Sequence, residues 1–280
     1  MIFSIVLSVF LSFPVFSQTY DELCERAVLA TEQDSLQQAE RYIREALQLD
    51  PANARNALLF SNLGTIQRSQ RKYELALESY TYALNMAPRN VPILLNRAAL
   101  YLELGKNEQA CVDYSMVLDL QPDNKEALSM RAYIYSQQRN YKGAHADYDS
   151  LLKLSPQDFQ ARLGLATLWQ KENKYESSLA ILNAMISEGM DDASLFTASQ
   201  RAVLYVARAG VERDMKHDDM ALMDLQEAIR LDDACSEAYL MRGRIYLTQR
   251  KKEQAKRDFE KAVSLGIPMA EMRELLQQCK

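Results

Sequence analysis

The charged residues best placed for chemistry are four arginines, each followed by an aspartate sixteen residues later. They form the sets Arg97 and Asp113, Arg131 and Asp147, Arg208 and Asp224, and Arg242 and Asp258. A guanidinium that faces a carboxylate can make two parallel hydrogen bonds to it, which suits a largely desolvated pair. Removing one partner would leave a lone buried charge and cost about 3–5 kcal/mol. We interpret the sets as structural ion pairs and not as catalytic groups.

The residue types that catalysis or metal binding would need are sparse. The two histidines, His145 and His217, have no second His or Cys at the spacing of a zinc site. The sequence has no Gly-rich phosphate loop, no GxSxG elbow and no HExxH helix. We therefore expect no enzymatic activity, no metal and no cofactor, and we expect both histidines at the surface. For Trp169 we expect a role in core packing.

Composition predicts a helical chain without a nucleic-acid site. The 280 residues carry a net charge of −5, and acidic and basic residues are interleaved. This pattern argues against a basic stripe for nucleic acid or a polybasic membrane arm. Only eight Gly and seven Pro occur, while strong helix formers such as Ala, Leu, Gln and Glu abound.

The N-terminus differs from the rest of the chain. Ile2 to Phe16 is an almost continuous apolar run, which is shorter than the roughly 20 residues of a spanning helix. Such a run is typical of the core of a signal peptide, and Val15 and Ser17 suit cleavage after Ser17. We expect residues 1–17 to be a signal peptide, with export to the periplasm or surface of a bacterium and no membrane span after cleavage. An uncleaved anchor is the alternative, because no Lys or Arg lies near Met1.

Prolines reveal an internal repeat, the feature to seek first in any sequence. Pro88, Pro122 and Pro156 recur at steps of 34 residues. The same period gives seven units, which begin near Tyr20, Ala57, Val91, Lys125, Phe159, Ala202 and Ser236. Position 8 is always small: Ala27, Gly64, Ala98, Ala132, Ala166, Ala209 and Gly243. Position 20 is small as well: Ala39, Ala76, Ala110, Ala144, Ser178, Ala221 and Ala255. Position 24 is large and apolar: Ile43, Tyr80, Tyr114, Tyr148, Leu182, Leu225 and Phe259.

These columns predict a pair of antiparallel helices in each unit. Small side chains let the helices approach closely, the bulky residue fills the space beside them, and Pro ends the second helix. In a hairpin that turns near position 15 or 16, positions 7 and 23 face each other, and these are the positions of the Arg and Asp pairs. The two units with Leu at position 7, Leu63 and Leu165, lack the Asp.

The pattern of small, small, aromatic and Pro positions over 34 residues resembles the tetratricopeptide repeat family. The resemblance covers the chain from about Tyr20 to its end and implies an all-α superhelical solenoid over residues 18–280. It implies about seven hairpins and a capping helix at Met269–Cys279. The fifth unit departs most, with Arg162 at an apolar position and Met190 in place of Pro. We expect the nine extra residues Ala193–Arg201 to lengthen the next helix toward Asp192.

In this arrangement no disulfide is expected. Cys235 begins one helix and Cys279 ends a later, nearly parallel one, and a dozen helical residues span roughly 18 Å. This distance exceeds the reach of a disulfide. Cys24 and Cys111 lie two repeats apart, so we expect four unpaired thiols.

The resemblance also implies a concave face that holds partner segments, lined by first-helix positions 2, 5, 6, 9, 12 and 13. The residues predicted to line it are Ser61, Asn62, Thr65, Arg68, Leu95, Asn96, Ala99, Leu102, Ser129, Met130, Tyr133, Gln137, Leu163, Thr167 and Gln170. Asn62 and Asn96 can hydrogen-bond to a partner's backbone amides.

The function that we predict is a protein-interaction scaffold or adaptor that binds a protein or peptide in the bacterial envelope. Two alternatives stay open: a recruiting subunit of an envelope enzyme or assembly complex, and a binder of glycans or small molecules.

Overall fold

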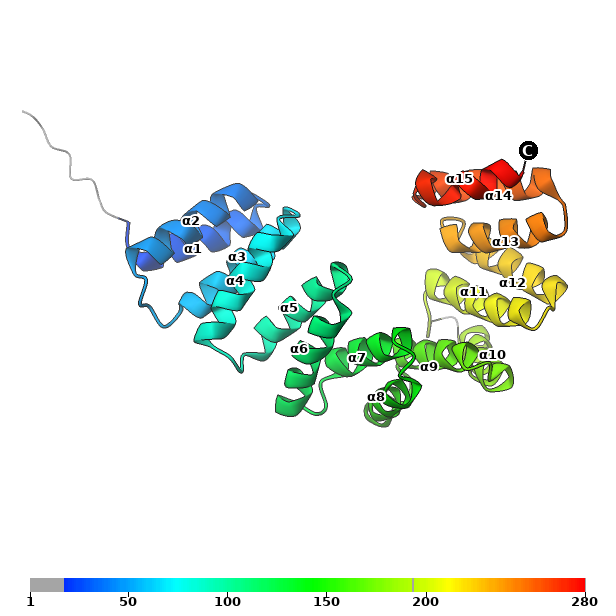
Figure 1. Cartoon of the computed structure of the whole chain (residues 1–280), viewed down its shortest axis with the longest axis horizontal. Helices are drawn as coiled ribbons and strands as arrows, with labels where there is room; N and C mark the ends of the chain where they lie inside the picture. The colour runs from blue at the N-terminus through cyan, green and yellow to red at the C-terminus, as the bar shows by residue number, and fades with distance from the viewer. Residues whose placement is uncertain (1–17, 193, 280) are drawn as a thin grey trace, which may run out of the picture. The chain divides into compact units, whose positions relative to one another are not determined.

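The structure is a computed structural model that describes residues 18–192 and 194–279, and all regular elements in that part are α-helices. The predicted signal peptide at residues 1–17 lies outside the described residues. The helices form hairpins in which each first helix packs along the second (Figure 1). The chain divides into two compact units, one ending at Pro122 and the other beginning at Asp123.

The first unit holds three hairpins. They are α1 (Tyr20–Glu32) with α2 (Leu36–Leu49), α3 (Asn56–Ser69) with α4 (Tyr73–Met86), and α5 (Val91–Glu103) with α6 (Asn107–Leu120). The predicted starts at Tyr20 and Val91 coincide with helix starts, and α3 begins one residue before Ala57.

The second unit holds four hairpins and a final helix. They are α7 (Lys125–Gln137) with α8 (Tyr141–Leu154), α9 (Phe159–Lys171) with α10 (Tyr175–Asp191), α11 (Ala198–Asp214) with α12 (Asp218–Leu231), and α13 (Ser236–Thr248) with α14 (Lys252–Ser264). The last helix, α15 (Met269–Gln278), packs on α14 as a capping helix should (Figure 1).

Local sequence explains where these helices start and turn. Asn90, Asn124 and Asp158 end three successive repeats, and each side chain accepts a hydrogen bond from an amide in the first turn of the next helix. Within each hairpin the residue at position 15 has a left-handed backbone, with φ between 56° and 68°. These residues are Asp34, Arg71, Gly105, Arg139, Asn173, Lys216 and Arg250. The left-handed residue closes the first helix and reverses the chain.

The core follows the three repeat columns. The small residues at position 20 are fully buried, and the large residues at position 24 are buried in every repeat. The bulky residue at position 24 lies beside the small residue at position 8, as predicted. A Cβ added to Gly64 at position 8 would lie only 2.8 Å from the ring of Tyr80 at position 24.

The insertion before the sixth repeat differs from its prediction. The added residues do lengthen α11, but its first residue is Ala198 and not a residue near Asp192. The side chain of Asp192 accepts hydrogen bonds from the amide and hydroxyl of Ser194, which turns the chain. Thr197 then starts the helix with a capping box. These two local motifs stop the helix from extending further back.

The insertion is also packed into the second unit. Phe196 is buried, and its ring lies edge-on to that of Phe159 with 5.2 Å between centroids. The preceding helix α10 runs to Asp191, three residues further than the fourteen-residue α8 would imply. Glu188, at position 30 of its repeat, makes a bidentate ion pair with Arg162, the residue that departs from the repeat pattern. This partner explains the unusual arginine.

The histidines and Trp169 differ in part from the sequence predictions. His217 is exposed as predicted, but His145 is half-buried, with Nε2 2.9 Å from Oε2 of Glu172. Trp169 is half-buried rather than part of the core, and its ring lies 6.3 Å from that of His145. Both side chains lie at the junction of neighbouring hairpins, which a single-repeat pattern does not describe. All four cysteines are free thiols.

Candidate functional site

The four arginine–aspartate sets form bidentate ion pairs inside their hairpins. In each pair Nε donates to Oδ2 and Nη2 donates to Oδ1, at distances of 2.7–2.9 Å. All four aspartates are buried. The hydrogen bonds that Arg97, Arg208 and Arg242 donate to their aspartates raise the pKa of these arginines. Each pair joins the two helices of its hairpin.

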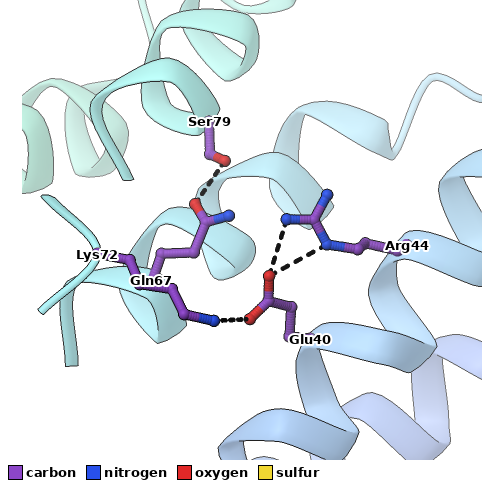
Figure 2. A network of polar contacts seen from close by, with 5 residues as sticks. All are labelled: Glu40, Arg44, Gln67, Lys72 and Ser79. Carbon is purple, nitrogen blue, oxygen red and sulfur yellow. Dashed lines mark hydrogen bonds and ion pairs between the residues drawn. The ribbon is translucent and has the colours of Figure 1, made fainter. Parts of the chain in front are cut away.

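The second repeat replaces this ion pair with a neutral bond. It has Leu63 at position 7, and the buried amide of Gln67 instead accepts a hydrogen bond from Ser79 at 2.7 Å (Figure 2). In the same view Glu40 of α2 binds Arg44 of its own helix and Lys72 at the turn before α4. Burial raises the pKa of Glu40, but the hydrogen bonds from Arg44 and Lys72 outweigh it and lower the pKa overall. This network joins the first two hairpins.

A pocket of about 360 Å³ lies between α1 and α3, on the faces of two consecutive first helices. Its walls are mostly apolar and include Tyr20, Val28, Leu58, Leu59 and Ile66. Val28 and Leu58 are more than half exposed, so the pocket presents apolar surface to solvent. An exposed apolar concavity of this kind marks a binding site more often than a scattered surface leucine does.

Polar groups hold the floor and rim of the pocket. The hydroxyl of Tyr20 donates to Oδ1 of Asn56 at 2.9 Å, and burial raises the pKa of Tyr20 to about 12. Asn56 in turn donates to the backbone carbonyl of Asp50, which fixes the connection between the hairpins. Arg55 lies over the Tyr20 ring, 4.9 Å from its centroid, and pairs with Asp21. The pocket is therefore held by its polar contacts before any ligand binds.

Most residues of this pocket were not predicted from the sequence. Among the predicted groove residues only Asn62 and Thr65 line it. Asn62 is exposed, and the Thr65 hydroxyl lies 3.0 Å from that of Tyr80. Cys24 and Val28 occupy positions 5 and 9 of the first repeat, and Leu58 occupies position 2 of the second, so applying the same positions to both repeats would have found them.

One predicted groove residue is buried, and two others already have hydrogen-bond partners within the chain. Ser61 is only 7% exposed, because its short side chain is covered where α3 packs against its neighbours. Arg68 donates to Glu103 of the next first helix at 2.8 Å, and this bond lowers the pKa of Glu103. Gln170 donates to Asp214 at 2.7 Å. These two side chains brace adjacent repeats.

The other predicted groove residues lie on first helices within their own units. In the first unit these are the half-buried Leu95, Asn96, Ala99 and Leu102 on α5. In the second unit the exposed residues are Tyr133, Gln137 and Thr167, and the half-buried ones are Ser129, Met130 and Leu163.

The described residues contain neither a cluster of metal ligands nor a membrane-spanning helix. Within 18–192 and 194–279 no group of three or more His, Cys, Asp or Glu side chains could hold a metal ion. In the same part of the chain no helix has both the length and the apolarity to cross a bilayer.

Comparison with known proteins places the repeats in a family. Residues 16–163 match the family described as the cytochrome c-type biogenesis protein H TPR domain. Residues 135–202 and 236–265 match two further families, each described as tetratricopeptide repeat. No curated protein matches the sequence.

Solved structures resemble the chain over most of its length. A tetratricopeptide repeat protein from Parabacteroides merdae is 37% identical, with a TM-score of 0.85, over 94% of this chain and 99% of its own. Yeast Tom70 shares the fold at 16% identity and a TM-score of 0.61, over 93% of this chain and 53% of its own. PilF of Pseudomonas aeruginosa shares it at 19% identity and a TM-score of 0.57, over 78% and 94%. By its repeat columns, its helical hairpins and these matches, the chain belongs to the tetratricopeptide repeat family.

Proposed function

We propose that the chain is an interaction scaffold that holds an extended segment of a partner protein, with a large apolar side chain of that segment in the α1–α3 pocket. Proteins of this family are in general non-enzymatic scaffolds that bind protein or peptide partners. The observation that carries the proposal is the pocket, which leaves apolar walls open to solvent on the first-helix face.

The size and chemistry of the pocket fit one anchoring side chain. A volume of about 360 Å³ accommodates a leucine, methionine or phenylalanine with space to spare. Burying such a side chain contributes about 1.5–3 kcal/mol, enough to fix the register of an otherwise weak segment. Asn62 at the rim is exposed, and its amide can both donate to and accept from the backbone of an extended segment.

We further propose that the protein acts in the bacterial envelope. Two observations support this: the apolar run Ile2–Phe16, which is typical of a signal peptide, and the match to the repeat domain of a cytochrome c biogenesis protein. The same match favours a second candidate function, recruitment of a client to an envelope assembly complex. Fusing the segment before Tyr20 to a reporter enzyme that is active only after export would test the location.

A peptide-display selection against the chain from residue 18 onward tests the binding role. We expect the selected peptides to share one large apolar residue. Substituting Leu58→Glu should weaken their binding at least tenfold, because it places a charge in the pocket wall. Leu58 is 56% exposed, so the substitution should leave the fold intact.

Leu29 provides a matched control. It lies on α1, is 54% exposed and does not line the pocket, so Leu29→Glu should bind the selected peptides like the unchanged protein. Equal binding by the Leu58→Glu variant would exclude the pocket. A thermal shift with sugars but none with peptides would instead favour the glycan alternative.

A further inference from the structure

A second cavity, in the other unit, is created by the insertion before the sixth repeat. It lies between α10, α11 and α12 and has a volume of about 230 Å³. Its apolar walls come from Ile186, Leu204 and Leu231, and its charged residues are Arg201, Glu227 and Arg230. None of these residues belongs to the α1–α3 pocket, so this site is independent of the function proposed above.

Arg201, the last of the nine inserted residues, carries an unused hydrogen-bond donor at this cavity. Its Nε is buried and has no hydrogen-bond partner in the part of the chain that the structure describes. A buried donor without an acceptor is costly, and guanidinium groups are almost always bonded when their nitrogens are desolvated. Because this Nε is covered by protein atoms, an acceptor in the cavity would bind the other nitrogens of the Arg201 guanidinium, and Arg201 lines the cavity.

The side chain of Arg201 is held in place by its surroundings. Gly189 of α10 has no Cβ, and one added there would lie 3.5 Å from Cδ of Arg201 and 2.9 Å from the ring of Phe196. The glycine therefore gives room for both the arginine stem and the buried phenylalanine.

The charges around the cavity leave it positive. Arg230 donates from Nε and Nη2 to both carboxylate oxygens of Glu227, at 2.8 and 2.6 Å. Both carboxylate oxygens of Glu227 thus accept hydrogen bonds from Arg230. These bonds lower the pKa of Glu227, and the charge of Arg201 lowers it further. Two arginines and one glutamate sum to a charge of +1 at the cavity. An anion is the ligand that would balance it.

We propose that this cavity binds a small carboxylate that carries a branched apolar group. The carboxylate would accept from the Arg201 guanidinium, and the apolar group would contact Ile186, Leu204 and Leu231. The apolar walls disfavour inorganic phosphate or sulfate, which would lose hydration without contacts to replace it. The same chemistry could come from a free branched-chain acid or from the C-terminal residue of a peptide.

Calorimetric titration with three probes tests the proposal: 4-methylpentanoate, N-acetyl-leucine and N-acetyl-leucinamide. We expect saturable binding of at least one acid at millimolar concentration and at least tenfold weaker binding of the neutral amide. Binding of both acids would favour a free carboxylic acid as the ligand, and binding of N-acetyl-leucine alone would favour a peptide terminus. This comparison uses the unchanged protein and so does not depend on the folding of a variant.

Substitution then assigns the site. Arg201→Gln removes the charge and should reduce acid binding at least tenfold, whereas Arg244→Gln, an exposed arginine on α13, should have no effect. Circular dichroism would check that both variants fold. The proposal is overturned if neither acid binds, if the amide binds as well as the acids, or if Arg201→Gln binds like the unchanged protein.

Discussion

Replacing the ion pair between Arg97 and Asp113 tests how the hairpins are held together. Asp113 is only 2% exposed and accepts two hydrogen bonds of 2.8 Å from Arg97. The Arg97→Met variant leaves this carboxylate buried without its partner, and we expect a loss of about 3–5 kcal/mol. Replacing both residues, as Arg97→Met with Asp113→Leu, removes the buried charge altogether. We expect the double variant to lie within about 1 kcal/mol of the unchanged protein or to exceed its stability.

Arg26 offers a matched control for this cycle. It occupies the same position 7 of the first repeat, but it is exposed and faces no aspartate, because position 23 there is Tyr42. Arg26→Met should therefore change stability by less than about 0.5 kcal/mol, as surface substitutions usually do.

The assay must report on one repeat, because repeat arrays can unfold in steps. Hydrogen exchange of the amides in α5 and α6 gives the free energy of opening that hairpin. Urea denaturation followed by circular dichroism gives the effect on the whole chain. The reasoning would be refuted if Arg97→Met were as mild as Arg26→Met, or if the double variant were as unstable as the single one.

Two further predictions concern the α1–α3 pocket and the insertion. Tyr20→Phe should cost about 1–3 kcal/mol at neutral pH, since it leaves Oδ1 of the buried Asn56 without its donor. The pKa of Tyr20 is raised to about 12 in the folded chain, against 10.0 for an unperturbed tyrosine. The stability that its neutral hydroxyl provides is therefore complete below pH 10 and is lost as the pH rises toward 12. The difference in unfolding free energy between the Tyr20→Phe variant and the unchanged protein, measured by urea denaturation, should therefore shrink between pH 10 and about 12. A difference that stays constant over this range would contradict the prediction. Gly189→Ala should lower the melting temperature, because the new Cβ would lie 2.9 Å from the Phe196 ring and overpacking costs about 1–3 kcal/mol. Gly210→Ala, whose Cβ would meet nothing closer than 3.4 Å, should raise it or leave it unchanged.

The sequence by itself determined the repeating part of this protein. A hairpin buries its residues against its own partner helix and its nearest neighbours, so each repeat encodes the same contacts at the same positions. For this reason the columns predicted the buried residues Ala76 and Tyr80, and the spacing of sixteen residues predicted the pair Arg97–Asp113.

Only the tertiary structure decided the features that break the repeat. The extent of α11 and the cavity at Arg201 depend on how a lengthened α10 packs beside the inserted residues. The ion pair of Arg162 with Glu188 joins α9 to α10 and is not part of the repeat columns. The α1–α3 pocket likewise depends on the space left between two neighbouring first helices. The repeat pattern specifies which residues face inward, but the distance between adjacent hairpins is set by many side chains packing together, and no single position encodes it.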